Sequence, residues 1–340
     1  MKNMSNWKNK KVLISGVTGF VGGNLVSALL KNGAEVFGIV RSHNPNCFLN
    51  YEGHNNKIRL FQGDIIDKDL WFNIITEQQI DVIYHLAAQV EVGVGLTNPY
   101  LTFETNVRGT YNMLEASRLA LKSGHKIEAI VVASSDKAYG EYPVEKMPYL
   151  EDYPLLPKYP YDTSKACADM ICQAYAIDEY KLPIVITRFS NIYGPGQMNF
   201  SAIVPDGIRS GLGLSKFTPR SDGSMVRDFI FAEDVADLYM KIAISLIDNP
   251  DILRGQIFNA GSDSPINMRN LITRIYQQLG NHLELERIIS EMKGKVTTGE
   301  IQHQHMSFKK VNDYFQWKPQ HTIEDGISKS ITWYKSFFNI

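Results

Sequence analysis

The chain has 340 residues, of which 44% are hydrophobic and 21% charged, and its formal net charge at pH 7 is -1. These are the proportions of a globular protein with a sizeable core, and the near-zero charge excludes a global basic field for nucleic acid or membrane. Three cysteines without a CxxC pair fit a reducing cytosol, so we expect a cytoplasmic protein. We expect no signal peptide or membrane span, because the first apolar run is only as long as a strand. We also expect no metal site, since His303 and His305 lack an evident third ligand.

Short apolar runs alternate with helix-like segments along the first half of the chain. Predicted strands lie at 11–15, 35–40, 58–62, 82–86, 128–134 and 183–188, and predicted helices at 24–31, 68–77, 99–121 and 161–180. This alternation predicts an α/β fold, a doubly wound parallel sheet (Rossmann) with helices on both faces. In the 99–121 helix, we expect Tyr100, Phe103, Tyr111 and Met113 to pack in the core, with a partner-binding stripe as the alternative.

Beyond about residue 193 the pattern loosens, and glycines and prolines such as Gly194-Pro195-Gly196 interrupt it. We therefore predict a Rossmann domain at 1–190 and a smaller C-terminal lobe, mainly 191–340. The lobe is expected to be interleaved with the first domain, because segments such as 256–259 read as strands that return to the sheet.

A glycine-rich loop, Gly16-Val-Thr-Gly19-Phe-Val-Gly22, joins the first strand to the first helix. Glycines allow a tight turn and a close backbone approach to a pyrophosphate, and the helix N-terminus offers N–H groups and a favourable dipole. The loop therefore predicts a dinucleotide cofactor of the NAD(P) type in the 1–190 domain. A plain strand-to-helix turn is the alternative, since the spacing is GxxGxxG rather than GxGxxG.

The end of the second predicted strand bears on which dinucleotide is bound. NAD sites often place an acid there to bond the ribose hydroxyls, whereas this chain reads Val40-Arg41-Ser42. Arg41 could hold a 2′-phosphate, which slightly favours NADP over NAD, unless Arg41 is only a solvated strand-end residue. Asp64, at the end of the third strand, is placed to meet an adenine, with a loop cap as its alternative role.

Tyr161-Asp-Thr-Ser-Lys165 opens a predicted helix, so Tyr161 and Lys165 lie on one helical face. A lysine ammonium near the positive ring of a cofactor can lower the pKa of a tyrosine from about 10. Such a tyrosine accepts a hydroxyl proton while a hydride leaves the adjoining carbon. The pair therefore indicates cofactor-linked hydride transfer.

With these features the chain resembles the extended short-chain dehydrogenases/reductases, specifically the nucleotide-sugar epimerases and dehydratases. The shared motifs are Gly16/Gly19/Gly22, His85-Leu-Ala-Ala88, Asn106-Val-Arg-Gly109-Thr110, Ser134-Ser135 with Tyr139-Gly140, Tyr161 with Lys165, Arg188-Phe-Ser-Asn191-Ile-Tyr-Gly194-Pro195, Arg227-Asp228-Phe229 and Trp317-Lys-Pro319.

The resemblance implies roles for individual residues. Ser135 would bond the sugar 4-hydroxyl, Tyr161 would take its proton, and Lys165 would bind the nicotinamide ribose. Substrate contacts would come from Gln89, Ser135, Asn191 and Arg227, although Arg227 could instead form a structural pair with Asp228 or Asp234. The implied cofactor contacts are Gly16, Thr18, Gly19, Phe20, Val21, Gly22, Arg41, Asp64, Ile65, Leu86, Ala87, Ala88, Asn106, Tyr161 and Lys165.

The residues after Ser135 bear on the reaction. Simple 4-epimerases of this family carry small or apolar residues there, whereas Asp136-Lys137 looks like the CDP-glucose type of 4,6-dehydratase. In that reading Lys137 removes the C5 proton and Asp136 protonates the departing C6 oxygen. Adjacent residues of an extended strand point to opposite faces, so both can face the sugar only if the chain has already turned. A solvated loop pair is the alternative.

The resemblance leaves the substrate nucleotide open. Strand end Gly38-Ile-Val40-Arg41 looks more like the GDP-mannose dehydratases, and the arginine that many relatives carry before the last helical segment is absent from Thr297-Thr-Gly-Glu300-Ile-Gln-His303. We expect an NDP-sugar 4,6-dehydratase, with a 4-epimerase and a non-catalytic NAD(P)-binding regulator as alternatives. The family also implies a homodimer formed through the helices near 99–121 and 161–180.

Overall fold

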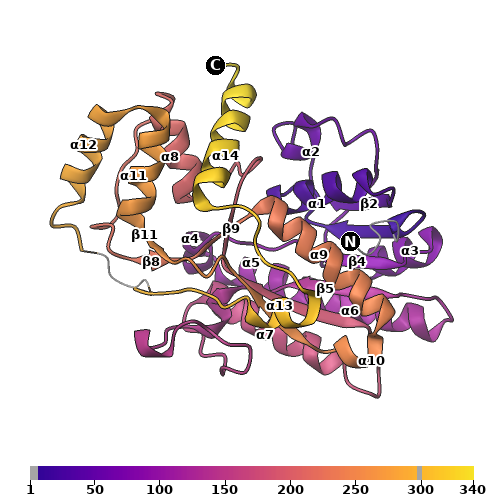
Figure 1. Cartoon of the computed structure of the whole chain (residues 1–340). Coiled ribbons are helices and arrows are strands. Elements are labelled where there is room, and N and C mark those ends of the chain that lie inside the picture. Colours follow the sequence, from indigo (N-terminus) through magenta and orange to yellow (C-terminus); the bar gives the residue numbers. More distant parts are fainter. Residues whose placement is uncertain (1–6, 297–300) are drawn as a thin grey trace.

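A computed structural model describes residues 7–296 and 301–340, and its centre is one parallel sheet (Figure 1). The strands of this sheet are β1 (Lys11–Ser15), β2 (Glu35–Val40), β3 (Arg59–Gln62), β4 (Val82–His85), β5 (Ala129–Ala133), β6 (Ile184–Phe189) and β10 (Ile257–Ala260). Their order is β3-β2-β1-β4-β5-β6-β10, and each neighbouring pair is parallel. The predicted doubly wound α/β fold is therefore confirmed.

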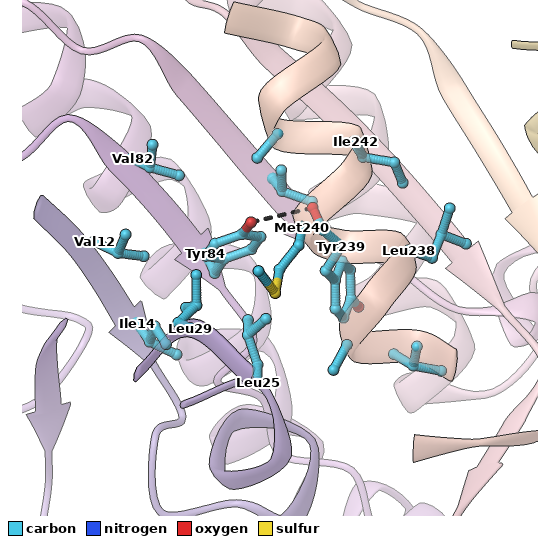
Figure 2. Close-up of a cluster of buried hydrophobic side chains, with 14 of the residues drawn as sticks. Val12, Ile14, Leu25, Leu29, Val82, Tyr84, Leu238, Tyr239, Met240 and Ile242 are labelled. Atoms are coloured by element: carbon cyan, nitrogen blue, oxygen red, sulfur yellow. Dashed lines mark hydrogen bonds between the residues drawn. The ribbon is translucent and has the colours of Figure 1, made fainter. Parts of the chain in front are cut away.

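Helices cover both faces of the sheet because side chains along each strand alternate between the faces. Val12 and Ile14 pack toward α1 (Phe20–Lys31) and α9 (Ala232–Asp248). Figure 2 shows this core, in which the Tyr84 hydroxyl donates to the Tyr239 carbonyl at 3.1 Å. Leu13 faces the opposite core, which is closed by α3 (Lys68–Gln78), α6 (Gly109–Lys122) and α7 (Pro160–Tyr175).

The strand order has a switch point between β1 and β4. From β1 the chain builds β2 and β3 on one side, and then crosses to build β4, β5 and β6 on the other. The loops that follow β1 and β4 therefore diverge at this switch point, which is where doubly wound sheets bind ligands. The glycine loop after β1 lies there.

Residues after β6 build most of a second lobe, seen to the left of the sheet in Figure 1. A small antiparallel pair (β8 with β11) and a small parallel pair (β7 with β9) belong to this part of the chain. Its elements are β7 (Asn191–Tyr193), α8 (Ile203–Gly211), β8 (Val226–Arg227), β9 (Phe229–Phe231), β11 (Ile266–Asn267), α11 (Met268–Leu279), α12 (His282–Met292), α13 (Lys309–Phe315) and α14 (Ile323–Phe338). A separate apolar cluster, including Ile208, Leu271 and Ile327, packs α8, α11, α12 and α14 together, whereas Val311 of α13 packs in the core beside the main sheet. Meanwhile β10 pairs with β6, so a late segment does return to the main sheet.

Two predicted helices differ from the structure. The 99–121 segment is not one α-helix, because a π-helical turn, η2 (Glu104–Arg108), separates α5 (Pro99–Phe103) from α6. The 161–180 helix ends at Tyr175, and a series of turns then leads through Lys181, at φ 53°, to Pro183 and β6. The remaining short elements are α2 (Phe48–Tyr51), α4 (Val92–Thr97), η3 (Asp136–Tyr139), η4 (Val144–Lys146) and α10 (Pro250–Leu253).

The expectation that four residues of the 99–121 segment pack in the core is wrong for three of them. Met113 is fully buried, whereas Tyr100, Phe103 and Tyr111 are exposed, Tyr100 at 73%. Helical periodicity marks one apolar face, but it does not say whether this chain or a partner covers it. Among the helices of the described residues, none is long and apolar enough to cross a membrane.

Candidate functional site

The glycine loop forms a backbone cradle at the start of α1. Gly16 has φ +75°, and a Cβ there would lie 2.8 Å from the Ala87 nitrogen. A Cβ on Gly22 would lie 2.3 Å from the Gly16 oxygen, so only glycine allows the helix to sit this close to the loop. The N-cap residue, Gly19, has no side chain to bond the first helical N–H groups. This arrangement fits the pyrophosphate of an NAD(P) cofactor, which Thr18, Phe20 and Val21 would flank.

A buried polar chain joins the glycine loop to the loop after β4. The Ser15 hydroxyl accepts bonds from the Leu86 and Ala87 nitrogens, both at 3.2 Å, and lies 2.8 Å from His85 Nδ1. Because the hydroxyl accepts two bonds, it donates its proton to Nδ1, which leaves Nε2 to donate to Thr110 at 3.2 Å. Burial lowers the pKa of His85 to about 3, so this imidazole stays neutral and holds the loop in place.

Three of the implied cofactor contacts, Arg41, Asp64 and Ile65, follow the ends of β2 and β3. Arg41 follows β2 and is exposed. Asp64 Oδ1 accepts the Ile66 N–H at 3.1 Å, which is the loop-cap role. Ile65 is buried, and its carbonyl accepts the Trp71 indole N–H at 2.8 Å. Asp64 and Ile65 thus shape the loop after β3.

Asn106 ties the loop after Ala88 to the helix that carries the tyrosine. Its Oδ1 accepts from the Gln89 backbone nitrogen at 2.7 Å, and its Nδ2 donates to the Gln89 carbonyl at 3.0 Å and to Ser164 Oγ at 2.8 Å. Asn106 sits in the π-helical turn, a rare distortion that often marks functional positions. The Gln89 side chain accepts a bond from Thr102 at 2.9 Å, so this predicted substrate contact is held in position.

Ser135, Tyr161 and Lys165 meet where β5 ends and α7 begins. Ser135 lies close enough to Tyr161 to affect its pKa, and Lys165 Nζ donates to the Ala133 carbonyl at 2.7 Å. Burial lowers the pKa of Lys165 to about 8. Burial also raises the pKa of Tyr161 well above its usual value, and the nearby Ser135 offsets part of that rise. Lys165, which we expected to lower the Tyr161 pKa, bonds a backbone carbonyl, and burial has the largest effect on the tyrosine.

The geometric condition on Asp136 and Lys137 is met, since the chain turns into the 3₁₀ helix η3 directly after Ser135. Ser135 caps this turn by accepting the Lys137 N–H at 3.2 Å, and its own hydroxyl donates to Asp136 Oδ1 at 3.0 Å. Asp136 is 5% exposed and lies close enough to Tyr161 to raise its pKa, while Lys137 Nζ donates to Gln304 Oε1. The solvated loop pair is therefore excluded for Asp136.

A second carboxyl group faces this cluster from inside the tyrosine motif. Asp162 is 4% exposed, and burial raises its pKa to about 6. The positive charge of Lys137 opposes that rise, whereas the negative charge of Asp136 adds to it. Three ionisable side chains from η3 and α7 thus share one electrostatic environment.

The two predicted diphosphate contacts lie on β7 and β8, which belong to two different small sheets of the second lobe. Asn191 Nδ2 donates to the Asp228 carbonyl at 3.1 Å. Arg227 is 6% exposed, and its Nη1 donates to the Val226 carbonyl at 2.9 Å. Its positive charge is near enough to lower the pKa of His303, although burial has the larger effect. The stretch 297–303, from which the arginine of many relatives is absent, is only partly described, because residues 297–300 lie outside the described residues.

Four positions of the site received no role from the sequence. Asp162 lies inside the Tyr161–Lys165 motif and His85 opens the His85–Ala88 motif, so both could have been noticed there, and Ser15 borders the glycine loop. Gln304 gave no signal, since it bonds Lys137 from 167 residues away. His303 Nε2 and His305 Nδ1 lie 3.1 Å apart, and within 7–296 and 301–340 no three His, Cys, Asp or Glu side chains gather as a metal site would require.

Comparison with known proteins agrees with this geometry. A family model described as GDP-mannose 4,6 dehydratase matches residues 13–330. Human dTDP-D-glucose 4,6-dehydratase is 27% identical over 337 residues, which cover 97% of this chain and 91% of that protein.

Two solved structures with bound NAD are similar over nearly the whole chain. The dTDP-glucose 4,6-dehydratase of Bacillus anthracis has a TM-score of 0.79 and 26% identity, covering 96% of this chain and 97% of its own. The UDP-glucose 4-epimerase of Thermus thermophilus has a TM-score of 0.78 and 26% identity, covering 96% and 99%. With the family model spanning most of its length, the chain belongs to the GDP-mannose 4,6-dehydratase family within the extended short-chain dehydrogenases/reductases.

Proposed function

We propose that the protein is an NAD(P)-dependent NDP-sugar 4,6-dehydratase. The observation that carries this proposal is the turn after Ser135, which brings Asp136 near Tyr161 and Lys137 near Asp162 of the same motif. A 4-epimerase needs only a proton acceptor at the 4-hydroxyl, whereas elimination of water also needs a base for C5 and an acid for the C6 oxygen. Asp136 and Lys137 supply these two groups.

Each residue has one role in the proposed sequence of steps. The bound cofactor supplies a hydride acceptor for C4 and later returns that hydride to C6. Ser135 orients the 4-hydroxyl, and Tyr161 accepts its proton as the C4–H bond breaks. Lys137 then takes the C5 proton, and Asp136 protonates the C6 oxygen, which leaves as water. Lys137 finally returns a proton to C5, so the product is a 4-keto-6-deoxy sugar, and the proton from O4 balances the one that left with water.

The alternative is a 4-epimerase, because the structurally similar Thermus thermophilus protein has that activity and Ser135, Tyr161 and Lys165 serve either reaction. A panel of NDP-hexoses separates the two when product mass is followed. We expect the loss of one water. An unchanged mass with a new stereoisomer would establish epimerisation instead, and bound cofactor without turnover of any sugar would favour a regulator.

Replacing Lys137 by Met tests the base assignment. The 4-keto sugar should still form with reduction of the cofactor, but elimination should slow by at least about a hundredfold, the usual contribution of a positioned base. Lys146→Met, an exposed lysine of η4, is the matched control. Full-rate 4,6-dehydration by Lys137→Met would remove Lys137 from the mechanism.

We also propose that Arg41 gives a slight preference for NADP. The exposed guanidinium at the end of β2, where no acid is present, supports this choice, although the two similar structures contain NAD. Dissociation constants for both cofactors decide it. NADP should bind more tightly to the wild type, and Arg41→Ala should remove the difference; a strong NAD preference in the wild type would refute the assignment.

The remaining parts of the proposal concern partners and place. Residues 1–190 would hold the dinucleotide and 191–340 mainly the nucleotide sugar, whose base stays open.

We propose a homodimer formed through α4, α5 and α7, whose exposed apolar side chains include Leu96, Tyr100 and Met170. We also propose a cytoplasmic location, supported by three free cysteines.

A further inference from the structure

Gln304 reaches the cluster of Asp136 and Lys137 from the far end of the chain. Its segment runs beside β8, because the Gln304 N–H donates to the Val226 carbonyl at 3.1 Å and the Val226 N–H donates to the Gln302 carbonyl at 2.9 Å. The residue is 1% exposed, which is unusual for glutamine. Burial of a primary amide is costly unless both of its ends find partners.

The contact with Lys137 fixes the orientation of the Gln304 amide. An amine can only donate to a carbonyl, so Oε1 faces Lys137 Nζ and Nε2 points away from it. Nε2 is buried and has no acceptor in hydrogen-bond geometry among the described residues. Tyr149 lies beside it, close enough for Gln304 to lower its pKa, and the Tyr149 hydroxyl donates its proton to the Gly140 carbonyl at 2.6 Å, but its oxygen does not lie in hydrogen-bond geometry to Nε2. A buried donor next to the reacting groups therefore points to an oxygen of a ligand.

An amide suits a lysine that must gain and lose a proton. Both the ammonium and the neutral amine can donate to Oε1, so the contact survives each proton transfer. A carboxylate in the same place would favour the ammonium and raise the pKa of the lysine by about 1–3 units. Ionisable groups near this site include Asp136, Asp162 and Tyr161. Tyr149 lies beside Gln304 with Arg227 near it, and His303 and His305 lie on the segment of Gln304.

We propose that Gln304 positions Lys137 for proton transfer through Oε1, while Nε2 donates to a hydroxyl oxygen of the bound hexose. The inference rests on the proposed function, in which Lys137 is the base at C5. In this proposal the second lobe takes part in the elimination, because the contact between its 301–308 segment and η3 holds Lys137 in place.

Two substitutions at Gln304 test the proposal in the full-length protein with bound cofactor. Gln304→Leu removes both contacts, so the 4-keto sugar and reduced nicotinamide should accumulate while elimination and C5 hydrogen exchange with solvent slow by roughly tenfold or more. Gln304→Glu keeps a bond to Lys137 but adds a negative charge that favours the ammonium. The pH midpoint at which deprotonation of Lys137 turns on elimination should therefore rise by about one unit or more. Gln302→Glu adds the same charge at an exposed neighbour and should leave that midpoint in place.

A direct titration of Lys137 separates this inference from the proposed function. The pH dependence of Lys137 acylation by a small amine-reactive reagent, followed by peptide mass spectrometry, needs no turnover. An upward shift in Gln304→Glu but not in Gln302→Glu supports the positioning contact even if the wild type proves to be an epimerase. An unshifted titration together with an unshifted elimination profile, in variants that melt and bind cofactor like the wild type, would overturn the inference.

Discussion

The surroundings of Tyr161 do not by themselves favour the deprotonated phenolate that would act as a base. Burial raises the pKa of Tyr161, and the nearby Ser135 offsets part of that rise. Lys165 is held by the Ala133 carbonyl rather than by the tyrosine. The phenol is therefore protonated in the protein alone at neutral pH, and the chemistry depends on what binds beside it.

Tyr161→Phe keeps the ring and its packing but removes the hydroxyl that takes the 4-hydroxyl proton. Hydride transfer from C4 should fall by about 10²–10⁴-fold, while the dissociation constant for the cofactor changes little. Single-turnover reduction of the bound nicotinamide measures this. The control is Tyr142→Phe, which removes only a bond to the Pro154 carbonyl. Comparable rates in Tyr161→Phe and the wild type would assign the proton transfer elsewhere.

At the scale of elements, the site depends on close contact between the glycine loop, α1 and the loop after β4. The Cβ distances at Gly16 and Gly22 leave no room for a side chain, and the bonds of Ser15 and His85 link β1, β4 and α6 behind them. The loops are thus held by buried groups rather than by surface contacts, which keeps their backbone N–H groups in position for a pyrophosphate.

Gly22→Ala should separate α1 from the loop. Overpacking of this kind destabilises by about 1–3 kcal/mol, and the displaced backbone should weaken cofactor binding by more than about tenfold. Thermal denaturation and cofactor titration measure the two effects. Gly93→Ala, in α4 with open space around it, should be neutral or stabilising by up to about 1 kcal/mol. Equal behaviour of the two variants would contradict the close packing at Gly22.

His85 predicts a specific loss of stability in acid. Its pKa is about 3 in the folded protein and about 6.5 when unfolded, so the unfolded state takes up the proton first. The stabilisation is complete above about pH 6.5 and is lost as the pH falls toward about 3. Between about pH 7.5 and pH 5.0 the wild type should lose about 2 kcal/mol more unfolding free energy than His85→Gln.

Urea denaturation of both proteins at the two pH values measures this difference. His43→Gln, at an exposed position, provides the control and should keep the pH dependence of the wild type. Parallel curves for His85→Gln and the wild type would mean that His85 is not held neutral in the folded protein.

At the scale of the whole molecule, exposed apolar side chains lie on α4, α5 and α7, which contact one another. They include Leu96 at 57% exposure, Tyr100 at 73% and Met170 at 53%. Exposed apolar side chains on helices that pack together fit an association surface. We propose that a second copy of this chain covers these side chains. The interface would then lie next to Tyr161 and Lys165, which α7 carries.

Tyr100→Glu places a charge on this surface and should convert the dimer to a monomer at micromolar concentration, because an unpaired charge is costly to bury. Light scattering coupled to size exclusion reports the mass. Tyr314→Glu adds the same charge at an exposed position of α13 and should remain dimeric. A wild type that is already monomeric would refute the dimer itself.

The sequence by itself determined the elements and motifs that depend on neighbouring residues. Strand and helix periodicity gave β1 and β2 with their observed bounds, and the spacing of Tyr161 and Lys165 put both on one face of α7. The glycine loop was equally readable, because its geometry is local to a strand, a turn and a helix. These features were sufficient to predict the fold class and the family.

Tertiary structure decided the features that depend on contacts between distant segments. Burial and neighbouring charges set the pKa values of His85, Lys165 and Asp162, and no local pattern reports them. The exposure of Tyr100 depended on which face of its helix the rest of the chain covers. Gln304 meets Lys137 only because the second lobe brings residues 167 positions apart into hydrogen-bond contact, and such a contact arises from the path of the folded chain rather than from sequence spacing.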